Sequence, residues 1–109
     1  MYILHCGTNN LRDNKKPEEI AKEILNLALK IKTEENDVMI SGIAPRTDNL
    51  DKKREEVNKK LKMFCEEANL EFISNSNLSN ITHLNGSGLH LNFEGTLTIA
   101  KNFTNAIKL

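Results

Sequence analysis

A histidine in a glycine-containing stretch is the first residue of this sequence whose chemistry stands out. It is His90, in GLHLNFEG (residues 88–95), two residues before Asn92, a residue type typical of helix caps. An imidazole changes its charge near neutral pH and serves enzymes as a general acid or base. A loop histidine also packs or caps, so from the residues alone both interpretations stay open.

A second polar stretch, GTNN (residues 7–10), directly follows an apolar run that is typical of a buried strand. The side-chain amide of Asn9 donates hydrogen bonds, which suits a binding or catalytic role. Asparagine also tolerates the unusual backbone angles of a turn, so a structural interpretation is equally open.

The other candidates for chemistry are weaker. His5 and His83 give no recognised metal-ligand spacing with His90, so we expect no metal. Ser41 and Ser87 are the serines near the predicted site, but neither lies on the strand-to-helix turn that a nucleophile needs.

Three further features have mainly structural interpretations. Cys6 and Cys65 lie in apolar stretches without a partner at motif spacing, which predicts two reduced, packed thiols. Arg46 follows a predicted strand, where it is positioned either to meet an anionic group or to stay exposed in its loop. The basic residues between positions 52 and 62 predict a solvated helix face.

The composition is that of one globular domain, residues 1–109, with 39% hydrophobic and 28% charged residues. Fifteen basic and fifteen acidic residues cancel, and a net charge of zero makes nucleic acid an unlikely partner. No apolar run is long enough to span a membrane, and residues 1–10 lack the charge pattern of a signal peptide. We therefore expect a cytoplasmic protein that does not enter a membrane.

Short apolar runs and amphipathic stretches alternate along the chain. They predict strands at residues 2–7, 37–43 and 70–74, and helices at residues 17–32, 50–69 and 92–109, with a polar loop at residues 75–91. The predicted buried stripes, in chain order, are Ile20, Ile24, Leu27, Ala28 and Ile31, then Leu50, Val57, Leu61, Phe64, Cys65 and Ala68, then Leu97, Ala100, Phe103 and Ile107.

Strands that alternate with helices predict a parallel sheet with right-handed crossovers and helices on its faces. The expected fold class is α/β, a partial three-layer α/β/α (flavodoxin-like) fold with three strands and three helices. Ligand sites in such folds lie beyond the carboxyl ends of the strands. The loops that carry Asn9, Arg46 and His90 are therefore expected to converge there.

Both polar stretches resemble motifs of one family, the SGNH (GDSL-type) hydrolases. ILHCGTNN (residues 3–10) resembles the block in which a buried strand runs into Gly-x-Asn-Asp. GLHLNFEG resembles the block with the catalytic histidine, Asp-x-x-His followed by a loop residue, a helix cap and a glycine. The resemblance covers nearly all of this chain but only the later half of a complete family domain.

The resemblance implies hydrolysis of carboxylic esters, small molecules, through an acyl-serine, with no metal or organic cofactor. By position, His90 is the general base, and Asn9 donates a hydrogen bond to the developing oxyanion. Gly7 allows the tight turn after the strand.

The sequence departs from the family pattern at three places. It has no Gly-Asp-Ser block, so the family's nucleophile is missing from these residues. Ser87 stands where the family has the Asp three residues before the histidine, and a hydroxyl cannot stabilise a charged imidazole as a carboxylate does. Asn10 replaces the last Asp of Gly-x-Asn-Asp, at a mainly structural position.

The missing block also affects assembly, since in the family its strand pairs beside the strand that ends in Gly-x-Asn-Asp. Residues 2–6 are therefore expected to form an open apolar edge, which invites a missing N-terminal half or a second copy of this chain. We expect a chain that is catalytically incomplete by itself. The alternative is a non-enzymatic binding or interaction module with a degenerate SGNH fold and a protein or RNA partner.

Overall fold

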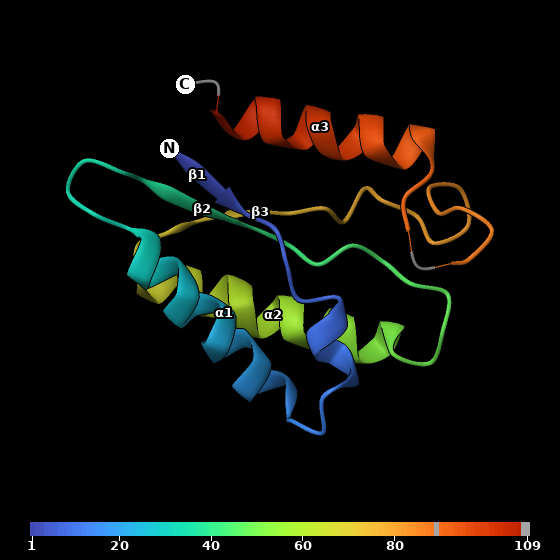
Figure 1. Ribbon diagram of the computed structural model, residues 1–109, viewed down its shortest axis with the longest axis horizontal. Helices are drawn as coiled ribbons and strands as arrows, with labels where there is room; N and C mark the ends of the chain where they lie inside the picture. Colours follow the sequence, from blue (N-terminus) through green and yellow to red (C-terminus); the bar gives the residue numbers. More distant parts are fainter. Residues whose placement is uncertain (89, 108–109) are drawn as a thin grey trace.

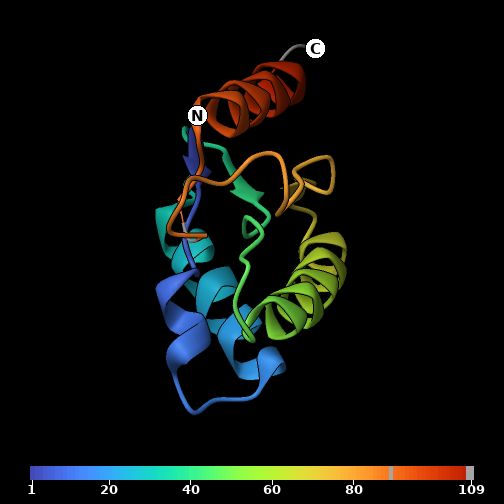
Figure 2. The same cartoon turned by 90° about the vertical axis from the view of Figure 1, so that its right-hand side faces the viewer.

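Three parallel strands lie between two unequal layers of helices in the computed structural model, which describes residues 1–88 and 90–107. β1 (Tyr2–Leu4), β2 (Val38–Ser41) and β3 (Glu71–Ile73) pair in the order β1-β2-β3. α1 (Pro17–Ile31) and α2 (Asp51–Glu67) cover one face, and α3 (Phe93–Ile107) lies over the other (Figure 1). Figure 2 shows the same layers after a quarter turn. The predicted α/β/α fold class is confirmed.

The strands differ in how deeply they are buried. Each of the four residues of β2 is buried, because β2 pairs with a strand on both sides and has helices over both faces. β1 pairs only with β2, in a register that sets Ile3 opposite Met39, and Tyr2 is 52% exposed. The expectation of a buried strand here is therefore wrong, since no residue of β1 is buried, whereas the expected open edge is present.

α1 and α2 form the apolar core together with β2. Pro17 opens α1 and two glutamates follow it, which suits the positive end of a helix dipole. The buried residues of the core are Leu11, Ile20, Ala21, Ile24, Ala28, Val38, Ile40, Ile43, Val57, Leu61, Cys65 and Leu70. The predicted stripe of α2 is confirmed, while in α1 Leu27 is 45% exposed and Ala21 is buried in its place.

α3 presents a different face to the sheet from the one that its spacing predicts. Gly95 and Ile99 are its buried residues, whereas Leu97 and Ile107 are 46% and 49% exposed. The physical reason lies in polar contacts, since Asn102 Nδ2 donates to Asn75 Oδ1 at 2.9 Å and fixes the rotation of the helix. The predicted stripe is therefore wrong at Leu97, Ala100 and Ile107, which are exposed, whereas Phe103 is half-buried against His5.

No helix among the described residues is both long and apolar enough to cross a membrane.

Replacing a core leucine tests the packing of α2 against the sheet. Leu61→Ala is expected to lower the free energy of unfolding by about 2–5 kcal/mol, because Leu61 is 0% exposed and its removal leaves a cavity. Met63→Ala on the same helix is the matched control, since Met63 is 43% exposed. Urea unfolding followed by circular dichroism measures both, and equal losses in the two variants would contradict this packing.

Candidate functional site

A hollow of about 330 Å³ lies at the carboxyl ends of the strands, where the sequence predicts the site. It is lined by His5, Thr8, Asn9, Arg12, Ala44, Arg46, His90 and Leu91. Three separate chain segments thus meet there, one after β1, one after β2 and one before α3. Asn9 and His90 share this hollow, as the sequence predicts.

The segment after β1 turns sharply to present Asn9. Gly7 has a φ of +109°, and a Cβ built on it would lie 2.8 Å from Ile43 Cδ1, so only glycine fits. Asn9 then begins a short 3-10 helix, Asn9–Arg12, and no described residue bonds its side-chain amide. Lys53 of α2 holds the far end of this turn, because its Nζ donates to the carbonyls of Leu11 and Asp13.

The segment before α3 is folded on itself around His90. The backbone N–H of Asn85 donates to the His90 carbonyl at 2.8 Å, and Leu84 pairs with Leu91 in an antiparallel bridge. Asn92 caps α3 as the sequence predicts, since its Oδ1 accepts from the N–H of Gly95 at 2.8 Å. The imidazole of His90 is exposed at the hollow and bonds none of the described residues.

Arg46 connects the loops after β1 and β2. Its side chain is only 1% exposed, so the interpretation as an exposed loop arginine is wrong. Nε and Nη2 donate to the carboxylate of Asp48, and Nη1 donates to the Thr8 carbonyl at 2.9 Å. The main-chain N–H of Arg46 donates to Asp51 Oδ1 at 2.8 Å. We call these four contacts the Arg46 bridge; its guanidinium arm fixes the residue before Asn9.

The residue after Arg46 holds the third segment. The N–H of Thr47 donates to the Gly88 carbonyl at 3.0 Å, two residues before His90. Gly88 has a φ of +71°, and a Cβ there would lie 1.8 Å from Thr47 Oγ1. Glycine is required at this position, because any side chain would push the histidine segment away from the loop after β2.

Ser41 and His5 form a pair that the sequence does not reveal. Ser41 Oγ lies 2.9 Å from His5 Nδ1 and accepts from Asn75 Nδ2 at 2.7 Å. Ser41 is 1% exposed, so its hydroxyl is structural rather than a nucleophile open to substrate. The ring of His5 packs edge-on against Phe103 of α3, and burial lowers the pKa of His5.

The remaining candidates from the sequence have local structural contacts. Ser87 donates its hydroxyl hydrogen to Asn85 Oδ1. His83 Nδ1 accepts from the N–H of Ser79 at 2.7 Å, within the loop before α3. Across the described part of the chain, no group of three or more histidine, cysteine or acidic residues is arranged to hold a metal ion.

The two cysteines are free thiols, as predicted. Burial raises the pKa of Cys6, and burial together with the neighbouring Glu66 raises the pKa of Cys65 to about 11. Such thiols stay protonated at neutral pH and are poor nucleophiles.

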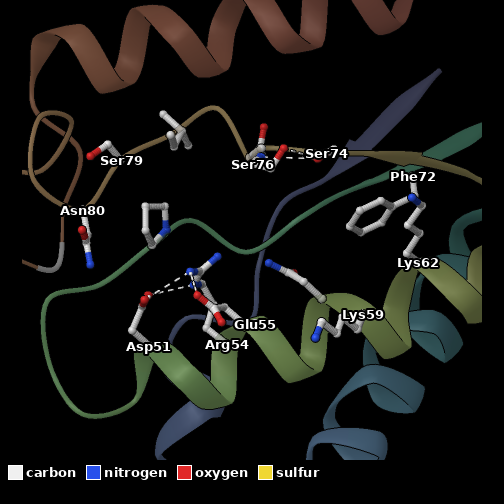
Figure 3. A pocket seen from close by; sticks show the side chains of 14 residues that line it. Asp51, Arg54, Glu55, Lys59, Lys62, Phe72, Ser74, Ser76, Ser79 and Asn80 are labelled. Atoms are coloured by element: carbon white, nitrogen blue, oxygen red, sulfur yellow. Dashed lines mark hydrogen bonds and ion pairs between the residues drawn. The ribbon is translucent and has the colours of Figure 1, made fainter.

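A larger hollow, of about 490 Å³, lies between α2 and the segment after β3 (Figure 3). Its charges are partly paired, because Arg54 bonds both Asp51 and Glu55. Ser74 and Ser76 bond each other at 3.0 Å, and no histidine or cysteine is among its described lining residues. The smaller hollow, with its two histidines and Asn9, is therefore the candidate active site.

The sequence places Gly7, Asn9 and His90 at the carboxyl ends of the strands, but it does not reveal the groups that hold them there. Lys53 and Arg54 belong to a basic run that predicts a solvated face, yet Lys53 holds a turn and the Arg54 side chain is 14% exposed. One feature of the sequence could have indicated the pairing of Arg46. Asp48 lies two residues after it, and a nearby carboxylate is a suitable partner for a guanidinium.

The parallel sheet has helices on both faces, and Asn9 and His90 line one hollow at the carboxyl ends of its strands. No protein-family model and no curated protein matches this sequence. Solved structures do match. The chain aligns with a GDSL-like lipase from Bacteroides thetaiotaomicron at a TM-score of 0.81 and 15% identity, over 97% of this chain and 60% of the lipase.

A member of the lipolytic protein G-D-S-L family from Veillonella parvula aligns at a TM-score of 0.77 and 22% identity, over 99% of this chain and 64% of that protein. These likenesses show an SGNH (GDSL-type) hydrolase-like fold. The chain spans less than two thirds of the length of each of these two proteins, so the activity of the whole proteins comes to it only as a proposal.

Removing the Arg46 guanidinium tests the Arg46 bridge. Arg46→Met is expected to lower the free energy of unfolding by about 2 kcal/mol, because the Thr8 carbonyl loses a charged donor in the interior. Amide shifts of residues 7–12 in NMR spectra are expected to move as well. Lys52→Met, an exposed change on α2, is the control, and an equally small effect of both variants would contradict the bridge.

The same bridge predicts a pH dependence of stability. Hydrogen bonds from Arg46 lower the pKa of Asp48, so its stabilising effect is complete above the unfolded pKa of about 3.9 and is lost as the pH falls through the lower folded value. The stability difference between the wild type and Asp48→Asn is expected to be constant above about pH 5 and to shrink below about pH 4. Urea unfolding at several pH values measures it; a difference that already shrinks near pH 6 would refute the assignment.

Proposed function

We propose that this chain is the later part of an SGNH hydrolase-like domain whose complete form hydrolyses carboxylic esters through an acyl-serine. The observation that carries the proposal is the hollow at the strand ends, which both Asn9 and His90 line. The 109 residues hold no Gly-Asp-Ser block, so by themselves they are catalytically incomplete. The proposed site of action is the cytoplasm, which the two free thiols favour.

In this proposal each residue has one role in acyl transfer. His90 takes the proton of the attacking serine and returns it to the leaving alcohol. Asn9 donates a hydrogen bond from its amide to the oxyanion of the tetrahedral intermediate. Gly7 sets the turn that presents Asn9, and the Arg46 bridge keeps Asn9 in place through the Thr8 carbonyl. No metal or organic cofactor takes part.

The weak point of the proposed chemistry is the partner of His90. A triad histidine gains most of its power from a carboxylate that stabilises the imidazolium, and replacing that Asp by Asn in a serine protease lowers kcat about 10⁴-fold. Here Ser87 stands at that position and bonds Asn85. The complete site is therefore expected to be slow, unless the additional segment supplies a carboxylate.

Two surfaces without a packing partner support a missing N-terminal half as the partner of this chain. β1 has one open edge, and Tyr2 at its start is half exposed. On the other side of the sheet, α3 lies alone and exposes Phe93, Leu97 and Ile107. A strand added beside β1, followed by a helix beside α3, would cover both surfaces and bring a serine to the carboxyl edge of the sheet.

Activity-based labelling tests the proposal. A fluorophosphonate probe applied to the native cells is expected to label a species clearly heavier than 12.3 kDa that contains this chain, because such a species includes the serine. Intact mass and peptide mapping identify the labelled residue. The purified 109-residue chain is expected to give no turnover of short-chain aryl esters above that of its His90→Ala variant.

Labelling of the 12.3 kDa chain itself, or turnover that is lost in His90→Ala, would disprove the incompleteness. A chain that is present in the cells but unlabelled at every mass would overturn the enzymatic proposal. The latter result favours the alternative, a non-enzymatic interaction module that pairs through the open edge of β1. A sizing column then decides, since edge pairing requires a dimer or a complex rather than a monomer.

A further inference from the structure

The candidate active site offers many hydrogen-bond donors and no described carboxylate. Its polar lining residues are the two histidines, Thr8, Asn9 and the two arginines, Arg12 and Arg46. A hollow with this lining repels cations and attracts anions. The question is which of its donors remain available to a ligand.

Arg46 is not available, although it lies in the wall. All three of its nitrogen groups donate within the protein, and Asp48 offsets its charge. Arg12 is the opposite case, because it is exposed and its guanidinium forms no ion pair or hydrogen bond with any described residue. The uncompensated positive charge of the hollow is therefore that of Arg12.

The position of Arg12 is fixed by its backbone. Arg12 ends the 3-10 helix that Asn9 begins, so the cation and the proposed oxyanion donor are one helical turn apart. Lys53 donates to the carbonyls on both sides of Arg12, those of Leu11 and Asp13, at 3.1 and 2.8 Å. The side chain starts from a fixed point beside the site, although its guanidinium is free to adapt.

His5 adds a neutral donor. Ser41 Oγ accepts from Asn75, so its own hydrogen is best placed toward His5 Nδ1 at 2.9 Å rather than toward the Gly42 carbonyl at 3.5 Å. This arrangement leaves the proton of the neutral ring on Nε2. The ring lines the hollow, and Nε2–H is the group that remains for a ligand.

We propose that the substrate of this site is an anionic ester, one that carries a carboxylate beside the scissile group, and that Arg12 selects it. The inference rests on the proposed function, because it assigns the ester carbonyl to Asn9 and the second, charged group to Arg12. Arg12 is in this view a specificity-determining residue, whereas the Arg46 bridge only supports the loop. Neutral esters of the same size lack the charged contact and bind more weakly.

Binding of a matched ester pair to the 109-residue chain tests this. Monomethyl succinate is the anionic probe and dimethyl succinate the neutral one, each titrated by ¹H–¹⁵N NMR at about 0.01 M ionic strength, where exposed charges are little screened. We expect monomethyl succinate to shift the signals of Asn9, Arg12 and His90. Its dissociation constant is expected to rise about 10-fold or more in Arg12→Gln, as for loss of one charged hydrogen bond.

Lys60→Gln is the matched control, since it removes the same charge from an exposed position on α2 and is expected to leave binding unchanged. Equal affinity for the two esters, equal binding by Arg12→Gln, or no binding by the wild type would each overturn the proposal. This binding titration does not depend on a serine nucleophile, so it can be carried out on the 109-residue chain. If the chain binds monomethyl succinate but no species is labelled in cells, the esterase proposal is refuted and the anion site stands. If a species is labelled but the chain does not bind the anionic ester, the anion site is refuted and the esterase proposal stands.

Discussion

The buried guanidinium of Arg46 is the constraint on which the arrangement of the candidate site depends. Arg46 lies in the loop after β2 and contacts Thr8, directly before Asn9, at 2.9 Å. Its neighbour Thr47 bonds Gly88, directly before the segment of His90. Two adjacent residues of one loop thus set the positions of the asparagine and of the histidine. The sheet places the three loops at one edge, and these two contacts fix the loops relative to one another.

A cation in the interior is costly unless its donors are satisfied, and here they are. Asp48 accepts two of the contacts, and Asp51 fixes the backbone N–H of the same residue. The other side of the molecule is also held by polar groups, because Asn102 of α3 bonds Asn75 after β3. The apolar core is built from the α1–α2 side and includes no residue of α3. The main apolar cluster therefore lies on the α1–α2 side, whereas α3 buries Ile99 and is also held by hydrogen bonds from Asn102.

These differences explain what the sequence predicts well. α1, α2 and β2 bury continuous apolar patterns, so periodicity finds them and most of their buried residues. Gly7 and Asn92 follow local rules for turns and caps, and the structure confirms their geometry. Periodicity fails for α3, because a helix held by an amide pair does not need to turn its most apolar stripe inward. It also fails for Arg46, whose partner Thr8 is 38 residues away in the chain.

Three features are incomplete and have one physical explanation under the proposed function. They are the exposed apolar residues of α3, the open edge of β1, and the absence of a serine or carboxylate beside His90 among the described lining residues. A helix over a sheet normally buries its apolar stripe, and an apolar edge strand normally has a neighbour. One added strand-and-helix unit supplies both, and its strand ends at the same edge as Asn9 and His90. In this view one added segment supplies both the residues that stabilise the complete domain and the serine that completes its chemistry. The 109 residues already form the core and the hollow, so the added unit would complete a site that is otherwise in place.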